Sequence, residues 1–151
     1  MTRQRLRLWL RLLKATKLVE ATVRENLRVQ FDTTLPRFDV LAALYRFEEG
    51  LKMSALSAAL RVSNGNVTGI VERLVADGLV LRVPVKGDKR ATLVRLTVKG
   101  RDEFAGMAAA HAGWVGSILE DLSPEACEQM IGILETVGGS PKLTARVDGD
   151  D

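Results

Sequence analysis

Residues 53–97 follow a helix-helix-strand-strand pattern, and this pattern constrains the fold more than any other feature of the chain. Apolar spacing predicts a short helix over 53–60 and, after a break at 61–62, a second amphipathic helix over 63–77 that ends at Gly78. Two runs that alternate apolar and polar residues follow, with a charged turn between them. Two crossing helices followed by a basic hairpin are typical of a winged helix-turn-helix, whose second helix fits the major groove of DNA.

The second of these helices combines an apolar stripe with a polar face whose first half carries no acid. The stripe has the spacing of a helix packed on a core: Val67, Ile70, Val71, Leu74 and Val75. The polar face presents short hydrogen-bonding side chains that can approach base edges and phosphates: Ser63, Asn64, Asn66 and Thr68. We predict that this face contacts DNA and that Arg73 reaches a phosphate. The alternatives are a plain helix cap at Ser63, solvated asparagines, and a structural ion pair at Arg73.

The turn between the predicted strands, 79–85 and 91–97, carries a strong positive charge. Its cations are Lys86, Lys89 and Arg90. Such a wing can reach the minor groove or the flanking phosphate backbone. Asp88 would repel phosphate, so we predict that its carboxylate accepts hydrogen bonds from Arg90 and fixes the orientation of the guanidinium. The alternative is an exposed ion pair, which is worth less than about 1 kcal/mol.

Long helical segments flank this region on both sides. A helix of about 40 Å is predicted over 5–31, at about 1.5 Å per residue. Its apolar stripe exceeds what a small core needs, so we expect part of it to meet another subunit. Pro36 fits the first turn of a helix over 36–47. After the hairpin, helices are predicted over 99–121 and 124–137.

Composition restricts the class of protein. The 151 residues are 46% apolar and 27% charged, which fits a globular chain with one core and room for an oligomerisation element. No apolar run approaches the roughly 20 residues of a membrane span, and no signal peptide is evident. The single cysteine can form neither an internal disulfide nor a zinc site. We therefore expect a cytoplasmic protein without membrane contact, metal or other cofactor.

The net charge of +3 conceals an asymmetry along the chain. Residues 1–30 contain eight Lys or Arg against two Asp or Glu, and residues 61–101 contain nine against three. Residues 102–151 contain two against ten. Because charges act within a Debye length of about 8–10 Å, these blocks do not cancel. A basic region around the wing suits a phosphate backbone, and the acidic part should point away from it, although solvated helix faces also produce such blocks.

In these segments the chain resembles the MarR family of bacterial transcriptional regulators. The resemblance covers about residues 35–137, and its most specific parts are an Asp-x-Arg wing at 88–90 and a Leu-Thr-x-x-Gly junction at 96–100. It implies an obligate homodimer joined by its first and last helices. It also implies near-palindromic operators, usually repression, and release by a small, often aromatic or phenolic ligand.

Carried over by position, the resemblance implies specific site residues. The groove contacts would be Ser63, Asn64, Asn66 and Thr68, with Arg73 in support. Arg90 would enter the minor groove, oriented by Asp88. Many members have Arg where this chain has Gly69, so one contact common in the family is absent here. An aromatic ligand pocket between the dimer helices and the winged domain would be lined by Trp9, Phe38, Tyr45, His111 and Trp114. Core or dimer packing is the alternative for the four aromatic residues. For His111, which could also sense pH, the alternative is a partly buried structural histidine.

These observations predict a mostly α-helical protein with a small β-hairpin wing. We expect the winged helix-turn-helix over 35–98, dimerisation helices over 1–34 and 99–138, and a flexible acidic tail over 139–151, all as one structural unit. The predicted function is a homodimeric, sequence-specific transcriptional regulator without enzymatic activity, which acts as a repressor that a small ligand releases from double-stranded DNA. Two alternatives remain: a sequence-tolerant structural DNA-binding protein without a ligand, and an oxidation-sensing regulator that uses Cys127.

Overall fold

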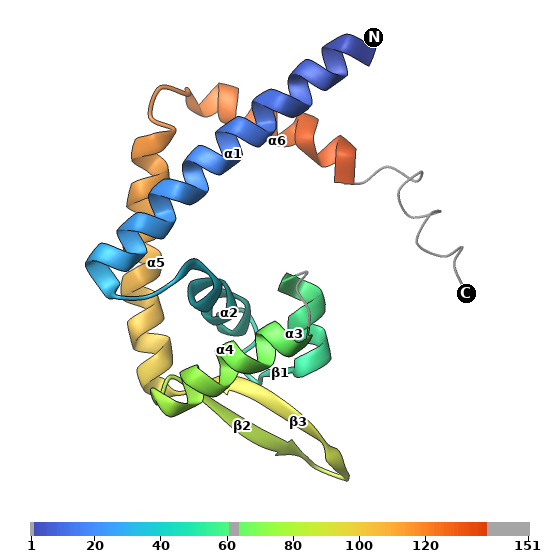
Figure 1. Ribbon diagram of the computed structural model, residues 1–151, viewed down its shortest axis with the longest axis vertical. Coiled ribbons are helices and arrows are strands. Elements are labelled where there is room, and N and C mark those ends of the chain that lie inside the picture. The colour runs from blue at the N-terminus through green and yellow to red at the C-terminus, as the bar shows by residue number, and fades with distance from the viewer. Residues whose placement is uncertain (1, 61–63, 139–151) are drawn as a thin grey trace. The chain divides into compact units, whose positions relative to one another are not determined.

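The structure is a computed structural model that describes residues 2–60 and 64–138 (Figure 1). The predicted break at 61–62, the predicted contact at Ser63 and the predicted tail at 139–151 lie outside these ranges. Two further predicted site residues have side chains that are not described: Asn64 and Lys89.

Six helices and three strands make up the described chain (Figure 1). In order they are α1 (Thr2–Phe31), α2 (Leu35–Tyr45), β1 (Leu51–Lys52), α3 (Met53–Leu60), α4 (Asn64–Ala76), β2 (Val80–Val85), β3 (Asp88–Leu96), α5 (Val98–Ile118) and α6 (Pro124–Gly138). The predicted fold, mostly α-helical with a small hairpin wing, is confirmed. The chain divides into two compact units within α5, one that ends at Val115 and one that begins at Gly116.

The wing is a three-stranded antiparallel sheet in the order β1-β3-β2. β3 pairs on one side with β2, where Val80 lies opposite Leu96, and on the other with β1, where Leu51 lies opposite Val94. The sequence did not predict β1, because a two-residue strand is too short to show an alternation. β3 also begins at Asp88, three residues before the predicted start of that strand.

The core of the first unit lies between α2, α4 and the sheet. The predicted stripe of α4 supplies Val67, Val71 and Leu74, each with no exposed surface, while Ile70 and Val75 are half-buried. From α2, Leu41 and Leu44 pack against the same core. Fully burying a Val or Leu side chain contributes about 1.5–3 kcal/mol. The stripe therefore fixes which side of α4 faces inward and which side faces out.

α4 ends in a glycine turn that fixes the start of the hairpin. Gly78 has a positive φ of 76°, and its N–H donates to the carbonyl of Val75 at 3.0 Å. The N–H of Leu79 donates to the carbonyl of Leu74, also at 3.0 Å. This pair of bonds is the Schellman arrangement, which satisfies the last carbonyls of a helix and requires a residue that tolerates positive φ.

The junction between β3 and α5 is tied to the end of α4. The N–H of Thr97 donates to the carbonyl of Leu79 at 3.0 Å, and its hydroxyl donates to the carbonyl of Gly78 at 2.7 Å. The same hydroxyl accepts the N–H of Gly100 at 2.9 Å, which caps α5. A Cβ on Gly100 would lie 1.9 Å from the carbonyl oxygen of Leu79. The Leu-Thr-x-x-Gly sequence therefore holds the end of α4, the wing and the start of α5 in one arrangement.

An ion pair adds a link between α2 and the end of α4. The Arg37 guanidinium lies 2.6 Å from the Asp77 carboxylate, and the Lys99 ammonium donates to the Asp77 carbonyl at 3.1 Å. The Arg37 side chain is 23% exposed and the Asp77 side chain is 52% exposed, so solvent still screens much of this ion pair. Two cations from different elements thus meet at the carboxyl end of α4, where the helix dipole favours positive charge.

Candidate nucleic-acid interface

The outer side of α4 carries two glycines, Gly65 and Gly69, between two polar edges, and we call this row of small residues the crest. Gly65 and Gly69 follow each other at four-residue spacing opposite the buried stripe, and a Cβ added to either would meet nothing within 4 Å. Thr68 is exposed on one flank. Because glycines leave the backbone of the crest uncovered, a duplex can approach α4 more closely than larger side chains would allow.

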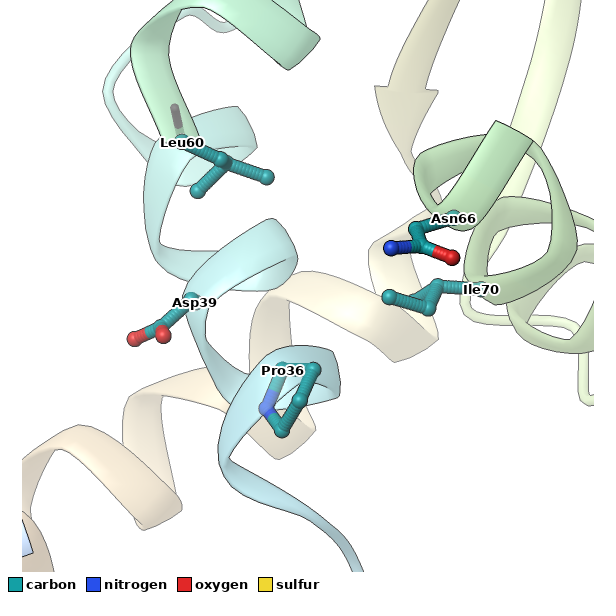
Figure 2. A pocket seen from close by; sticks show the side chains of 5 residues that line it. All are labelled: Pro36, Asp39, Leu60, Asn66 and Ile70. Carbon is teal, nitrogen blue, oxygen red and sulfur yellow. The ribbon is translucent and has the colours of Figure 1, made fainter. Parts of the chain in front are cut away.

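Asn66 lies on the other flank, at the edge that faces α2. Figure 2 shows Asn66 and Ile70, one turn apart on α4, facing Pro36 of α2 across a pocket. The Asn66 side chain is exposed at this edge of the helix. Sequence reasoning placed Asn66 with Thr68 on one polar face, whereas the two side chains lie on opposite flanks of the crest.

Arg73 is exposed in the last turn of α4, on the same row as the two glycines. It forms no ion pair within the described part of the chain, whereas its neighbour Glu72 lies 3.9 Å from Arg82 of β2. A structural ion pair, the alternative considered for Arg73, is therefore not seen among the described residues. Its role as a phosphate contact stays a prediction.

Asp88 binds the backbone of Arg90 instead of its guanidinium. The Arg90 N–H donates to Oδ1 of Asp88 at 3.0 Å, and the two side chains form no ion pair in the described structure. Asp88 thus accepts a hydrogen bond from Arg90, as predicted, but from its backbone N–H, and the predicted contact with the guanidinium is not seen among the described residues. The physical reason is that an Asp side chain is short enough to fold onto the backbone N–H two residues ahead, which is an Asx-turn.

Arg90 lies in an irregular part of the wing. Pro84 pairs with Thr92, but the next residue of β2, Val85, pairs with Asp88, so three residues of β3 lie in a bulge. Bulges redirect side chains and increase the local twist of a strand. Arg90 is exposed there, and Lys86 is exposed at the turn beside it.

A groove at the base of the wing adds two polar residues that sequence reasoning missed. It has a volume of about 280 Å³ and is lined by Lys52, Met53, Ser54, Arg90, Ala91 and Thr92. Lys52 belongs to β1 and Arg90 to β3, so two cations that are distant in sequence meet at one opening. A groove with two cations and a hydroxyl suits a phosphate. Only the pairing of β1 with β3 brings these residues together, and no local sequence signal shows it.

The predicted aromatic residues occupy two different environments. Phe38 is 6% exposed and stacks on His111 at 4.8 Å, while Tyr45 contacts Phe104 at 5.0 Å. Trp114 lies 6.5 Å from His111. Trp9, by contrast, is 56% exposed on α1. Four of the five therefore form one row of packed rings, and their role as a ligand pocket stays a prediction.

Two further titratable side chains, Asp39 and Cys127, lie outside the surfaces described above. Burial raises the pKa of the Asp39 carboxyl, the nearby carboxylate of Glu20 raises it further, and His111 acts in the opposite direction. Cys127 is half-buried in α6, and its redox role stays untested.

Among the described residues there is no cluster of three side chains that could hold a metal ion. None of the described helices is both long enough and apolar enough to cross a bilayer.

The chain is similar to known proteins in sequence and in fold. Residues 31–91 match the profile of the MarR family. The transcriptional activatory protein BadR of Rhodopseudomonas palustris is 32% identical over 120 residues, which cover 78% of this chain and 68% of that protein. A crystal structure of a MarR family transcriptional regulator from Silicibacter pomeroyi is 35% identical, with a TM-score of 0.71 over 90% of this chain and 96% of that chain. Sco3205 of Streptomyces coelicolor, solved in complex with DNA, shares the fold at 23% identity, with a TM-score of 0.80 over 91% of this chain and 88% of that one.

Proposed function

The chain belongs to the MarR family of transcriptional regulators, and from this premise we propose that it binds a near-palindromic operator as a homodimer. The observation that carries the proposal is that one compact unit holds an exposed recognition helix and a cationic wing. The hydrogen bonds of Thr97 and Gly78 tie these two elements together. A duplex can therefore meet both elements at once without rearrangement of the unit.

In this proposal the crest of α4 enters the major groove and the wing follows the backbone beside it. Thr68 and Asn66 reach base edges or phosphates from the two flanks, and Arg73 contacts a phosphate. Ser63 and Asn64 extend this contact toward the amino end of α4. Arg90, with Lys86 and Lys89, reaches the minor groove or its phosphates. Lys52 and Ser54 hold a further phosphate at the base of the wing.

The apolar surface of α1 supports the dimer. Leu6, Trp9, Leu10 and Leu18 are each between 56% and 60% exposed. A shallow groove on the same helix is lined by Leu10, Leu13, Lys14, Lys17, Leu18 and Ala21. α6, in the other unit, also exposes Ile131, Ile133 and Leu134. Exposed apolar patches this large mark interaction sites, and a second copy of the chain offers the same apolar helices in return.

The experiment starts from duplexes selected from a random library by the purified full-length chain. Fluorescence anisotropy then compares the selected duplex with a scrambled one of equal length. A sequence-specific regulator should prefer its site by about 10³-fold or more. Comparable affinity for both duplexes would refute sequence-specific recognition and would favour the alternative of a sequence-tolerant DNA protein.

Single-residue variants test whether the wing contacts the duplex. Arg90→Ala should weaken binding to both duplexes and reduce the slope of log K against log salt concentration by about 1 for each wing. Arg3→Ala, which removes an exposed cation at the start of α1, is the matched control and should leave the slope unchanged. Equal slopes for the two variants would show that the wing does not contact the duplex.

We also propose that the bound dimer represses transcription and that a small molecule releases it. A protein that covers one or more turns of a promoter excludes polymerase, which supports repression. BadR is named an activator. Whether this chain represses or activates transcription therefore has to be measured, with a reporter that carries the selected operator. Removal of the regulator should raise expression; a fall would identify an activator.

A further inference from the structure

The first half of α1 carries a row of cations on one side of the helix. This cationic row follows a spacing of four, four and three residues, and its members are Arg3, Arg7, Arg11 and Lys14. All four are exposed, and within the described part of the chain none of them forms an ion pair. Arg28, near the other end of α1, lies 2.6 Å from Glu25. Residues 1–19 contain six Lys or Arg and no acid, so this half of α1 does not neutralise its own charge.

α6 carries a row of the opposite sign. This acidic row consists of Glu125, Glu128 and Glu135, whose spacing places them on one side of the helix. Each is exposed, and none forms an ion pair with another described residue. The helix contains no Lys or Arg between Pro124 and Gly138. At about 1.5 Å per residue the acidic row spans about 15 Å and the cationic row about 17 Å, so the two rows match in length.

Each row borders exposed apolar side chains on its own helix. Leu10 lies one turn from Arg7 and one turn from Lys14, and it is 60% exposed. Ile131 lies one turn from two of the glutamates, and it is 48% exposed. In coiled coils, charged residues beside an apolar seam determine which helix becomes the partner. The two rows are therefore placed to select the partners of the apolar sides.

Like charges disfavour two of the three ways in which these helices can pair between two copies. α1 against α1 would bring two cationic rows together, and α6 against α6 would bring two acidic rows together. α1 against α6 joins opposite charges, and two-fold symmetry forms this contact twice in a dimer. Another polyanion could also cover the cationic row, but it would leave the acidic row without a counter-charge.

We propose that the cationic row of α1 pairs with the acidic row of α6 in a second copy of the chain, and that this pairing decides which helices meet. The proposal rests on the proposed homodimer and names the residues that select its partner. A single exposed ion pair contributes little to association, so Arg3→Ala alone should leave the dimer intact. Only the reversal of a whole row should change the partner.

Two reversed variants of the full-length chain test the pairing. The α1-reversed variant carries Arg3→Glu, Arg7→Glu, Arg11→Glu and Lys14→Glu. The α6-reversed variant carries Glu125→Lys, Glu128→Lys and Glu135→Lys. For each variant alone, Kd of the homodimer should rise by about 100-fold or more, because both symmetric contacts change from attraction to repulsion.

Mixing the two variants gives the decisive result. In their heterodimer both contacts again join opposite charges. After subunit exchange in an equimolar mixture, native mass spectrometry should therefore find the heterodimer as more than about nine-tenths of all dimers, whereas random exchange gives about half. A random composition would refute the pairing.

Two further chains control for folding and for net charge. A chain that carries both reversals should recover the wild-type Kd. If that chain recovers while the mixture stays random, the rows pair within one chain and the proposal fails. The matched control reverses four exposed cations outside α1, and should leave the dimer unchanged: Lys52→Glu, Lys86→Glu, Arg90→Glu and Arg95→Glu. A dimer lost in this control as well would assign the effect to net charge and overturn the proposal.

Salt provides a second readout of the same contact. Because exposed charges are screened, added salt should weaken the wild-type dimer and strengthen the homodimers of both reversed variants. The same response in all three would contradict the pairing. A wild-type chain that sediments as a monomer would contradict the proposed function itself, whereas a wild-type dimer whose variants exchange at random would refute the charge pairing alone.

Discussion

Replacing Gly100 by alanine tests whether the junction between the wing and α5 is as close as the structure shows. Gly100 is the third residue of α5, and a Cβ there would lie 1.9 Å from the carbonyl oxygen of Leu79 and 2.8 Å from its carbonyl carbon. Real Cβ atoms essentially never approach heavy atoms closer than 3.0 Å. The Leu79 carbonyl would have to move, and it accepts the Thr97 N–H at 3.0 Å.

The expected change in stability is the difference between two opposing effects. Overpacking of a well-packed site costs about 1–3 kcal/mol, and loss of the bond to Thr97 costs about 1 kcal/mol more. Alanine is a better helix former than glycine by about 1 kcal/mol, which offsets part of that cost. Gly100→Ala should therefore destabilise the protein by about 1–3 kcal/mol, or lower Tm by about 2–12 °C for a chain of this size.

Gly106 on the same helix is the matched control. It is exposed, and a Cβ there would meet nothing within 4 Å. Gly106→Ala should raise the free energy of unfolding by about 1 kcal/mol through helix propensity alone. Thermal denaturation followed by circular dichroism, at equal protein concentrations, should give shifts of opposite sign. An equal or raised Tm for Gly100→Ala would refute the reasoning, since it would mean that the Leu79 carbonyl is not where the structure places it.

Three further outcomes follow from contacts elsewhere in the molecule. Leu18→Glu, on the exposed apolar side of α1, should reduce the mass seen by sedimentation from twice 16.5 kDa to 16.5 kDa; a dimer that persists would exclude this face from the interface. A double-mutant cycle on Arg37 and Asp77 should give a coupling of about 1 kcal/mol, at the upper end for exposed pairs, and additive effects would show that the ion pair does not stabilise the fold. Because the pKa of Asp39 is raised in the folded state, its stabilising contribution should be complete below the ordinary value of 3.8 and lost as pH rises through the folded value. The stability of Asp39→Asn relative to wild type should therefore increase over that pH range in chemical denaturation, and a constant difference would contradict the assigned environment.

Periodicity was sufficient to predict the elements and the inward face of the recognition helix. The stripe of Val67, Val71 and Leu74 and the alternation on both sides of the charged turn are local signals, and they gave the helices and the hairpin to within a few residues. The Leu-Thr-x-x-Gly spacing was also visible. The reason for glycine at position 100 could not be predicted, because the atom that excludes a side chain there belongs to Leu79, some twenty residues earlier.

The parts of the site that escaped prediction depend on distant pairings. Lys52 joins the wing only through the pairing of β1 with β3, and the bulge at Arg90 depends on the register between two strands. Asn66 was assigned to the outer face from its polarity, although its position around α4 places it toward α2. Asp88 was matched with the nearest cation, whereas a short side chain reaches the adjacent backbone N–H more readily.

Tethered cleavage of the operator tests most directly whether the α4 crest lies in the major groove with the wing beside it. In a Cys127→Ser background, Gly65→Cys places an iron chelate on the crest, Lys86→Cys places it on the wing tip, and Arg3→Cys serves as the control. Crest cleavage is predicted inside two half-sites whose centres lie about 34 Å apart, or a multiple of that spacing, and wing cleavage at their outer flanks. Identical cleavage patterns from crest and wing, or cleavage from the control alone while DNA remains bound, would contradict the account.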